Sequence, residues 1–210
     1  IKDSDYQPAI EQGIAIKKAE ITTIANSPEA PTFANTIEAM ERAGQMLDRV
    51  EAVFRAVVAA NTNDTLDKVD SATSPALAAL NDAILLDPRL FARIKVLHDH
   101  EASLGLAPDQ AMLLDITYAQ FVHDGALLAP ADKARLTAIN QQLSTLSTDF
   151  SQRLTAATRD GALVIKDAGA LQGLSPAALA DAARAASQRK LPVGNYVIPM
   201  QNTTQQPVTG

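Results

Sequence analysis

The three histidines are the first side chains to examine for chemistry, because imidazole is a common zinc ligand and general base. His98 and His100 lie two residues apart in a stretch with helical spacing. On a helix their side chains point about 200° from each other, so they could not hold one ion. His123 lies near the expected end of another helix, where a partly charged imidazole suits the negative end of the helix dipole. We interpret all three as exposed histidines near helix ends rather than as metal ligands.

Motifs of known catalytic centres are missing from the sequence as well. No histidine begins an HExxH sequence, which would place two zinc ligands and a glutamate base on one helical face. There is no GxSxG turn, and without cysteine there is no Cys/His pair. The stretch Gly169–Gly173 lacks the further glycine and the lysine of a phosphate-binding loop, and Glu38, Glu41 and Glu51 are typical of solvated helix surfaces. We therefore predict no catalytic, cofactor-binding or metal-binding residue, and no activity for this chain alone.

The composition favours closely packed helices. The chain has 210 residues, of which 47% are hydrophobic but only 4% aromatic, and alanine is abundant. Strands prefer aromatic and β-branched residues, so this mixture favours helix. The length allows one large domain or two small ones. The net charge of −6 would repel a phosphate backbone, so we expect no nucleic-acid partner.

The compartment is only weakly constrained. No apolar run approaches the roughly 20 residues needed to span a bilayer, so we expect no membrane association. The absence of cysteine fits the cytoplasm without excluding the periplasm. No signal peptide precedes Ile1, but the chain begins without methionine, so an upstream segment could have been removed. We expect a cytoplasmic protein, with the periplasm as an open alternative.

The stretch from Pro130 to Gly161 has the most regular pattern in the sequence. Its apolar residues recur every three or four positions, at Leu136, Ile139, Leu143, Leu146, Phe150, Leu154 and Ala157. This spacing predicts one helix of more than 20 residues with a continuous apolar stripe. Because such a stripe is normally buried, we predict that Leu143 and Leu146 are fully buried against other helices.

The other elements follow from caps, prolines and apolar spacing. Helices are expected over Asp5–Ala25, from Asp87 towards Gly105, and over Pro108–His123. Another helix should run to Ala60 from a capping box at Asn35 and Glu38, or from a start at Thr32. A further helix is expected from Asp64 to Ile84, with a kink or break at Pro75. Short apolar runs at 162–166 and 195–200, joined by a helix that starts at Ser175, are predicted to pair as strands. The predicted fold is an all-α multi-helix bundle with one small two-stranded β element near the C-terminus, and residues 1–210 form a single helical domain.

Three stretches resemble the N-terminal part of the thimet oligopeptidase family of zinc metallopeptidases. They are Pro31–Arg42 (PTFANTIEAMER), Asn61–Asp64 (NTND) and Gln201–Pro207 (QNTTQQP). Within this family the closing stretch is most similar to the bacterial peptidyl-dipeptidases (dipeptidyl carboxypeptidases), and Ser144–Thr158 adds to the likeness. The resemblance covers essentially the whole chain, and nothing after Gly210 completes a fold, so we expect a fragment of a larger peptidase.

The resemblance implies a mostly helical enzyme about three times as long as this chain. In such enzymes two halves enclose a deep channel, and two histidines of HExxH with a later glutamate hold a zinc ion while the motif glutamate activates water. None of these residues maps onto this chain. The chain would be the non-catalytic N-terminal domain, one wall of a channel that admits short peptides. Its partners would be its own C-terminal catalytic domain, which would hold the zinc, and those peptides.

A free-standing helical adaptor that binds protein partners through an exposed groove is the alternative. The two hypotheses differ in the gene sequence beyond Gly210, because a peptidase gene would continue into HExxH. Peptide preference is not readable from these residues, since the specificity pockets would be shared with the other half.

Overall fold

A computed structural model describes residues 1–199, apart from the side chain of Arg159. The chain forms two compact units, one from Ile1 to Thr148 and a second beginning at Asp149. Helices dominate the first unit, and the second adds one small antiparallel sheet. This confirms the predicted all-α bundle with a two-stranded element, whereas the single-domain organisation of residues 1–210 stays a prediction.

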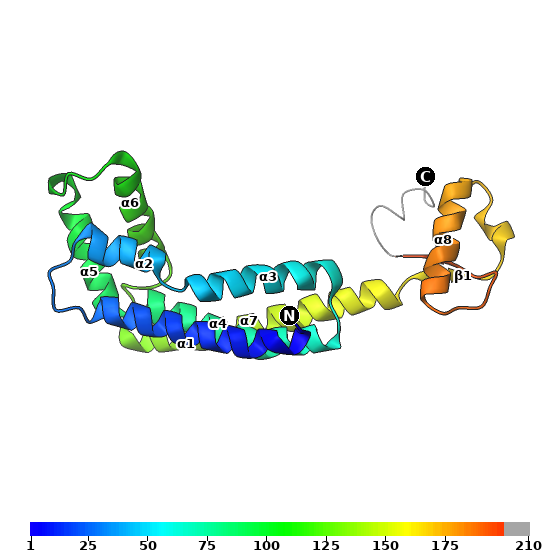
Figure 1. Ribbon diagram of the computed structural model, residues 1–210, viewed down its shortest axis with the longest axis horizontal. Helices are drawn as coiled ribbons and strands as arrows, with labels where there is room; N and C mark the ends of the chain where they lie inside the picture. Colours follow the sequence, from blue (N-terminus) through cyan, green and yellow to red (C-terminus); the bar gives the residue numbers. More distant parts are fainter. Residues whose placement is uncertain (200–210) are drawn as a thin grey trace. The chain divides into compact units, whose positions relative to one another are not determined.

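Six of the helices lie wholly within the first unit. They are α1 (Tyr6–Ala25), α2 (Ala39–Arg42), α3 (Gln45–Asn61), α4 (Asp64–Leu85), α5 (Pro88–Asp99) and α6 (Pro108–His123). Helices α1, α3 and α4 run alongside one another, and α5 packs against α6 beside α2 (Figure 1). Helix α7 (Pro130–Asp160) begins in this unit and ends in the second.

Local capping chemistry sets where several helices begin. Asp87 caps α5 by accepting hydrogen bonds from the backbone N–H groups of Arg89 and Leu90, with Pro88 at the first helical position, as predicted. Helix α4 is one helix with Pro75 inside it. Its cap is Asn63, whose side chain accepts from two backbone N–H groups, and not Asp64, which we predict as the cap from the sequence.

The prediction of one long helix ending at Ala60 is wrong, because this range forms two separate helices. A π-helical turn at Ala34–Glu38 leads into α2, and α3 begins only at Gln45. The break falls at Gly44, whose φ of 84° is left-handed and whose N–H donates to Glu20 Oε2 at 2.7 Å. The apolar spacing continues across the break, which is why periodicity alone did not reveal it.

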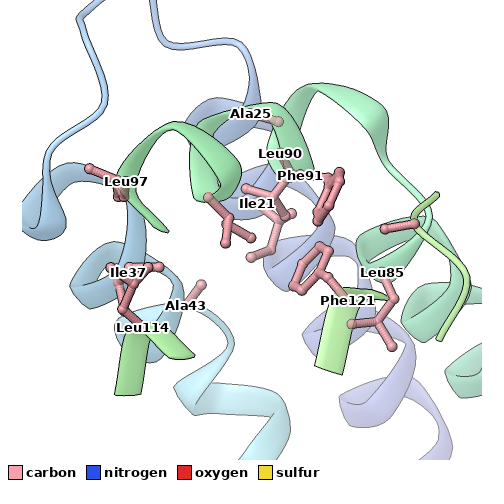
Figure 2. Close-up of a cluster of buried hydrophobic side chains, with 12 residues drawn as sticks. Ile21, Ala25, Ile37, Ala43, Leu85, Leu90, Phe91, Leu97, Leu114 and Phe121 are labelled. Carbon is pink, nitrogen blue, oxygen red and sulfur yellow. The ribbon is translucent and has the colours of Figure 1, made fainter. Parts of the chain in front are cut away.

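Two apolar clusters form the core of the first unit. One joins α1, α5 and α6 and is drawn in Figure 2, where the rings of Phe91 and Phe121 lie among aliphatic side chains. These two rings stack with centroids 6.3 Å apart. The other joins α1, α3 and α4 around the fully buried Phe54, whose ring lies 5.3 Å from that of Tyr6. Gly13 permits the close approach of α1 to α3, since a Cβ there would lie 3.0 Å from Leu47 Cα.

The predicted burial of the α7 stripe is wrong. The helix itself is present over nearly the predicted range. However, Leu143 and Leu146 are 59% and 65% exposed, and Ile139 is exposed as well. Within the first unit α7 makes polar contacts with α4 and the residue after it: Asn140 Nδ2 donates to Asp82 Oδ1 at 2.7 Å, and Lys133 Nζ donates to the Leu86 carbonyl at 3.1 Å. Periodicity shows that a helix has an apolar face but not that this chain covers it.

The second unit contains the predicted strand pair. Strands β1 (Leu163–Ile165) and β2 (Tyr196–Ile198) are antiparallel, with Val164 opposite Val197. Helix α8 (Pro176–Gln188) connects them and is capped by Ser175 as expected, whose Oγ accepts from the Ala178 N–H. Their small core is Ala162, Ala186 and Val197. The end of the predicted second run, Met200, and the stretch Gln201–Gly210 lie outside the described residues.

Candidate functional site

The three histidines make separate contacts. The His98 ring stacks on Tyr118 with centroids 3.8 Å apart, and its Nε2 lies 3.6 Å from Asp115 Oδ1. This half-buried position contradicts the expectation that His98 is exposed. His100 is exposed just after α5, with Nδ1 2.9 Å from the Val96 carbonyl, and the exposed His123 lies 3.2 Å from Asp124 Oδ1.

The donor set for a catalytic metal is not assembled in the part of the chain that the structure describes. Within residues 1–199, no three His, Asp or Glu side chains are close enough together to hold one ion. A hydrolytic zinc site needs about three protein ligands and an open position. The described residues by themselves therefore do not supply the ligand set of a hydrolytic zinc site.

The Pro31–Arg42 stretch has a structural role centred on Asn35. The Asn35 Oδ1 atom accepts hydrogen bonds from the Thr32 N–H at 2.8 Å and from Arg93 Nη2 at 2.8 Å, while the Asn35 N–H donates to Thr32 Oγ1 at 3.1 Å. The turn thus starts at Thr32, and the predicted capping box of Asn35 with Glu38 is wrong. Glu38 instead pairs with Arg42 at 2.9 Å.

Arg93 of α5 fixes this turn from the other side. The Arg93 side chain is buried, and its Nη1 donates to the carbonyls of Ser27 and Glu29 at 3.2 and 2.9 Å. A planar guanidinium can hold several acceptors at once in this way. The arrangement positions the loop between α1 and α2.

The Asn61–Asp64 stretch also has a structural role. Asn63 caps α4 through its Oδ1, and its Nδ2 donates to Asp3 Oδ2 at 2.8 Å. One amide therefore joins the start of α4 to the N-terminal turn. The third stretch of the resemblance, Gln201–Pro207, lies outside the described residues.

A groove between α4 and α7 is the strongest candidate for a functional surface in the first unit. It has a volume of about 490 Å³, and its lining includes Asp82, Leu85, His123, Asn140 and Leu143. Asn140 Nδ2 of α7 donates to Asp82 Oδ1 of α4 at 2.7 Å. A second groove, of about 370 Å³, also reaches Asp82.

Asp82 is unusual because it is a buried carboxylate with one unsatisfied oxygen. The residue is only 6% exposed, and its Oδ2 has no hydrogen-bond partner among the described residues. Buried carboxylate oxygens are normally paired, since removing a charge from water is costly. This oxygen can therefore accept an N–H group or pair with a cation that enters the groove.

The sequence analysis missed Asp82 and Asn140. Asp82 lies three residues before the buried Leu85 on α4, and Asn140 lies one residue after Ile139 of the stripe. A helical projection places Asp82 near an apolar face, which was the available signal. That signal does not identify the partner, because the two residues are 58 positions apart.

A second carboxylate, Asp87, lines the other groove and has a perturbed pKa. Partial burial opposes its ionisation, but the side-chain hydrogen bond from Arg89 and the two capping N–H groups outweigh that effect. The pKa of Asp87 therefore lies below its ordinary value. The Arg89 side chain and the two capping N–H groups account for this shift, so it requires no ligand.

Comparison with known proteins gives a close match over nearly the whole chain. The sequence is 45% identical over 207 residues to dipeptidyl carboxypeptidase of Salmonella typhimurium and 43% identical over 207 residues to that of Escherichia coli. The chain is homologous to part of a dipeptidyl carboxypeptidase. This confirms the resemblance inferred from the three stretches, whereas no family model matches the chain.

The match covers nearly all of this chain but less than a third of each relative. It includes 99% of this chain but only 30% of the length of each dipeptidyl carboxypeptidase.

Within residues 1–199, no helix is both long and apolar enough to cross a membrane.

Proposed function

We propose that this chain is the non-catalytic N-terminal domain of a zinc metallopeptidase that removes C-terminal dipeptides from short peptides. The observation that carries the proposal is the 45% identity over 207 residues to a protein named dipeptidyl carboxypeptidase. In this role the chain forms one wall of the substrate channel, and its first partner is the catalytic domain of the same polypeptide.

The chemistry available in the chain supports a non-catalytic role. The conspicuous polar residues of the two described family stretches, Asn35 and Asn63, are occupied in fixing a turn and capping a helix. The zinc ligands and the general base would come from the catalytic domain, which would supply a polarised water for peptide hydrolysis. The described residues would contribute shape and support.

A comparison of two proteins tests the proposal: the 210-residue chain and the complete product of its gene. We expect the complete product to bind zinc, to release dipeptides from a peptide with a free C-terminus, and to lose this activity to a chelator. The 210-residue chain should show neither stoichiometric zinc nor dipeptide release. Tight zinc binding with dipeptide release by the shorter chain would refute the domain assignment.

A free-standing adaptor is the second candidate, favoured by the exposed apolar residues of α7. An adaptor needs such a face for a partner protein, as does a domain that packs on a catalytic half. A complete gene product without peptidase activity, whose reading frame contains no HExxH, would favour the adaptor.

We propose the cytoplasm as the compartment, with the periplasm as the alternative. Fractionation of cells that express the gene at its native level distinguishes the two.

A further inference from the structure

The part of α7 in the first unit presents an apolar face that this chain leaves uncovered. Ile139, Leu143 and Leu146 lie on one side of the helix, with exposed fractions of 59% and 65% at the two leucines. Clustered large apolar side chains on a helix mark a contact surface far more often than isolated ones do. Leu143 also lines the α4–α7 groove, so the face and the groove are continuous.

Asp82 adds a polar requirement to the same groove. Its Oδ1 is satisfied by Asn140, whereas its Oδ2 is buried and has no partner among residues 1–199. An occupant that brings one N–H group or one cationic side chain would satisfy this oxygen. The groove therefore calls for an apolar segment that carries a basic side chain.

We propose that the α4–α7 groove of the first unit is the docking surface for the rest of the same polypeptide, with a lysine or arginine paired to Asp82 and apolar side chains packed on Leu143 and Leu146. This proposal rests on the proposed function, because it takes the catalytic domain as the occupant. In Figure 1 the two helices run along the same side of the unit, and the Asn140–Asp82 bond joins them.

Two observations favour this occupant over others. The chain accounts for 30% of the length of the dipeptidyl carboxypeptidases that it matches, so 70% of such a protein is available to cover the face. A second copy of this chain is a poorer partner, since each copy carries a net charge of −6 and the groove already contains a carboxylate whose Oδ2 has no partner among residues 1–199.

The first test places charges on the apolar face. Leu143→Glu/Leu146→Glu is compared with Met112→Glu/Ile116→Glu on α6, where the side chains are similarly exposed at 59% and 56%. In the 210-residue chain both pairs should leave the urea midpoint nearly unchanged. In the complete gene product only the α7 pair should increase the rate at which trypsin cleaves this domain from the rest, by about tenfold or more. The reason is that the proposed contact would bury both leucines, and the substitutions remove them.

The second test changes the unsatisfied oxygen of Asp82. Asp82→Asn keeps an oxygen that can accept from Asn140 and removes the unpaired charge. In the 210-residue chain the urea midpoint should therefore rise or stay constant. In the complete product the same change should increase the protease-susceptible population by roughly 30-fold or more, since a buried charge pair loses one partner. The control is Asp124→Asn, which removes a charge from the lining of the same groove but leaves Asp82 intact.

The outcomes separate this proposal from the proposed function. Opposite effects of Asp82→Asn in the two proteins support the docking surface, even if the complete product releases no dipeptides and the peptidase assignment fails. Dipeptide release with no response to either α7 or Asp82 substitutions overturns the docking surface alone. Equal effects of the α6 and α7 pairs also overturn it. A 210-residue dimer that Leu143→Glu/Leu146→Glu converts to monomer would identify a second copy as the occupant and likewise overturn it.

Discussion

Replacing Arg93 by lysine tests whether the buried guanidinium fixes the loop between α1 and α2. Arg93 donates to the carbonyls of Ser27 and Glu29 and to Asn35 Oδ1, over distances of 3.2, 2.9 and 2.8 Å. A lysine ammonium is a single point donor on a flexible stem, so it cannot reach all three acceptors in the geometry of the planar fork. We expect it to keep about one of these contacts.

The magnitude comes from the two hydrogen bonds that are lost. Hydrogen bonds to charged groups contribute about 1.5–3 kcal/mol each, and the loop carbonyls regain part of this from water. We therefore expect Arg93→Lys to lower the free energy of unfolding by about 3 kcal/mol. For a chain of this size, that corresponds to a decrease in Tm of about 6–12 °C.

Urea and thermal unfolding of the 210-residue chain measure this effect. The control is Arg42→Lys, because Arg42 is exposed and pairs with Glu38 one turn away, so a change within about 0.5 kcal/mol is expected. Asn35→Ala combined with Arg93→Lys should be clearly non-additive, since the two side chains share a hydrogen bond. Additive effects, or an Arg93→Lys protein as stable as wild type, would refute the assigned role.

Three other substitutions probe the first unit by unfolding measurements. Phe54→Ala should lower the free energy of unfolding by about 3–5 kcal/mol, because it empties a fully buried site; a loss below about 1 kcal/mol would contradict that packing. Gly44→Ala should lower it by at least about 1 kcal/mol, since φ is 84° and a Cβ would clash with Lys17. Asp87→Asn should lower it by about 0.5–1 kcal/mol at about pH 7. Because the folded-state pKa of Asp87 is depressed, this difference exists above about pH 4 and disappears as the pH falls through the folded pKa; a constant difference would argue against the shift.

Elements whose signals are local could be predicted from the sequence alone. The Asp87–Pro88 pair predicted the start of α5, and Ser175 predicted the start of α8. Both predictions succeeded because a cap involves only the next three residues of the chain. The two short apolar runs around α8 predicted the strand pair for a similar reason, since few other arrangements satisfy their backbone groups. The peptidase likeness was also readable from linear stretches.

Which surfaces are covered and which polar groups are paired depends instead on the tertiary fold. The apolar spacing of α7 predicted a helix correctly, but burial of Leu143 depends on what lies opposite it in space. Asn35 accepts from Arg93 across 58 residues, and Asp82 accepts from Asn140 across 58 residues, so neither partner could be read from local sequence. A helical period reports the chemistry of a face, whereas burial and pairing are set by segments that meet only after folding.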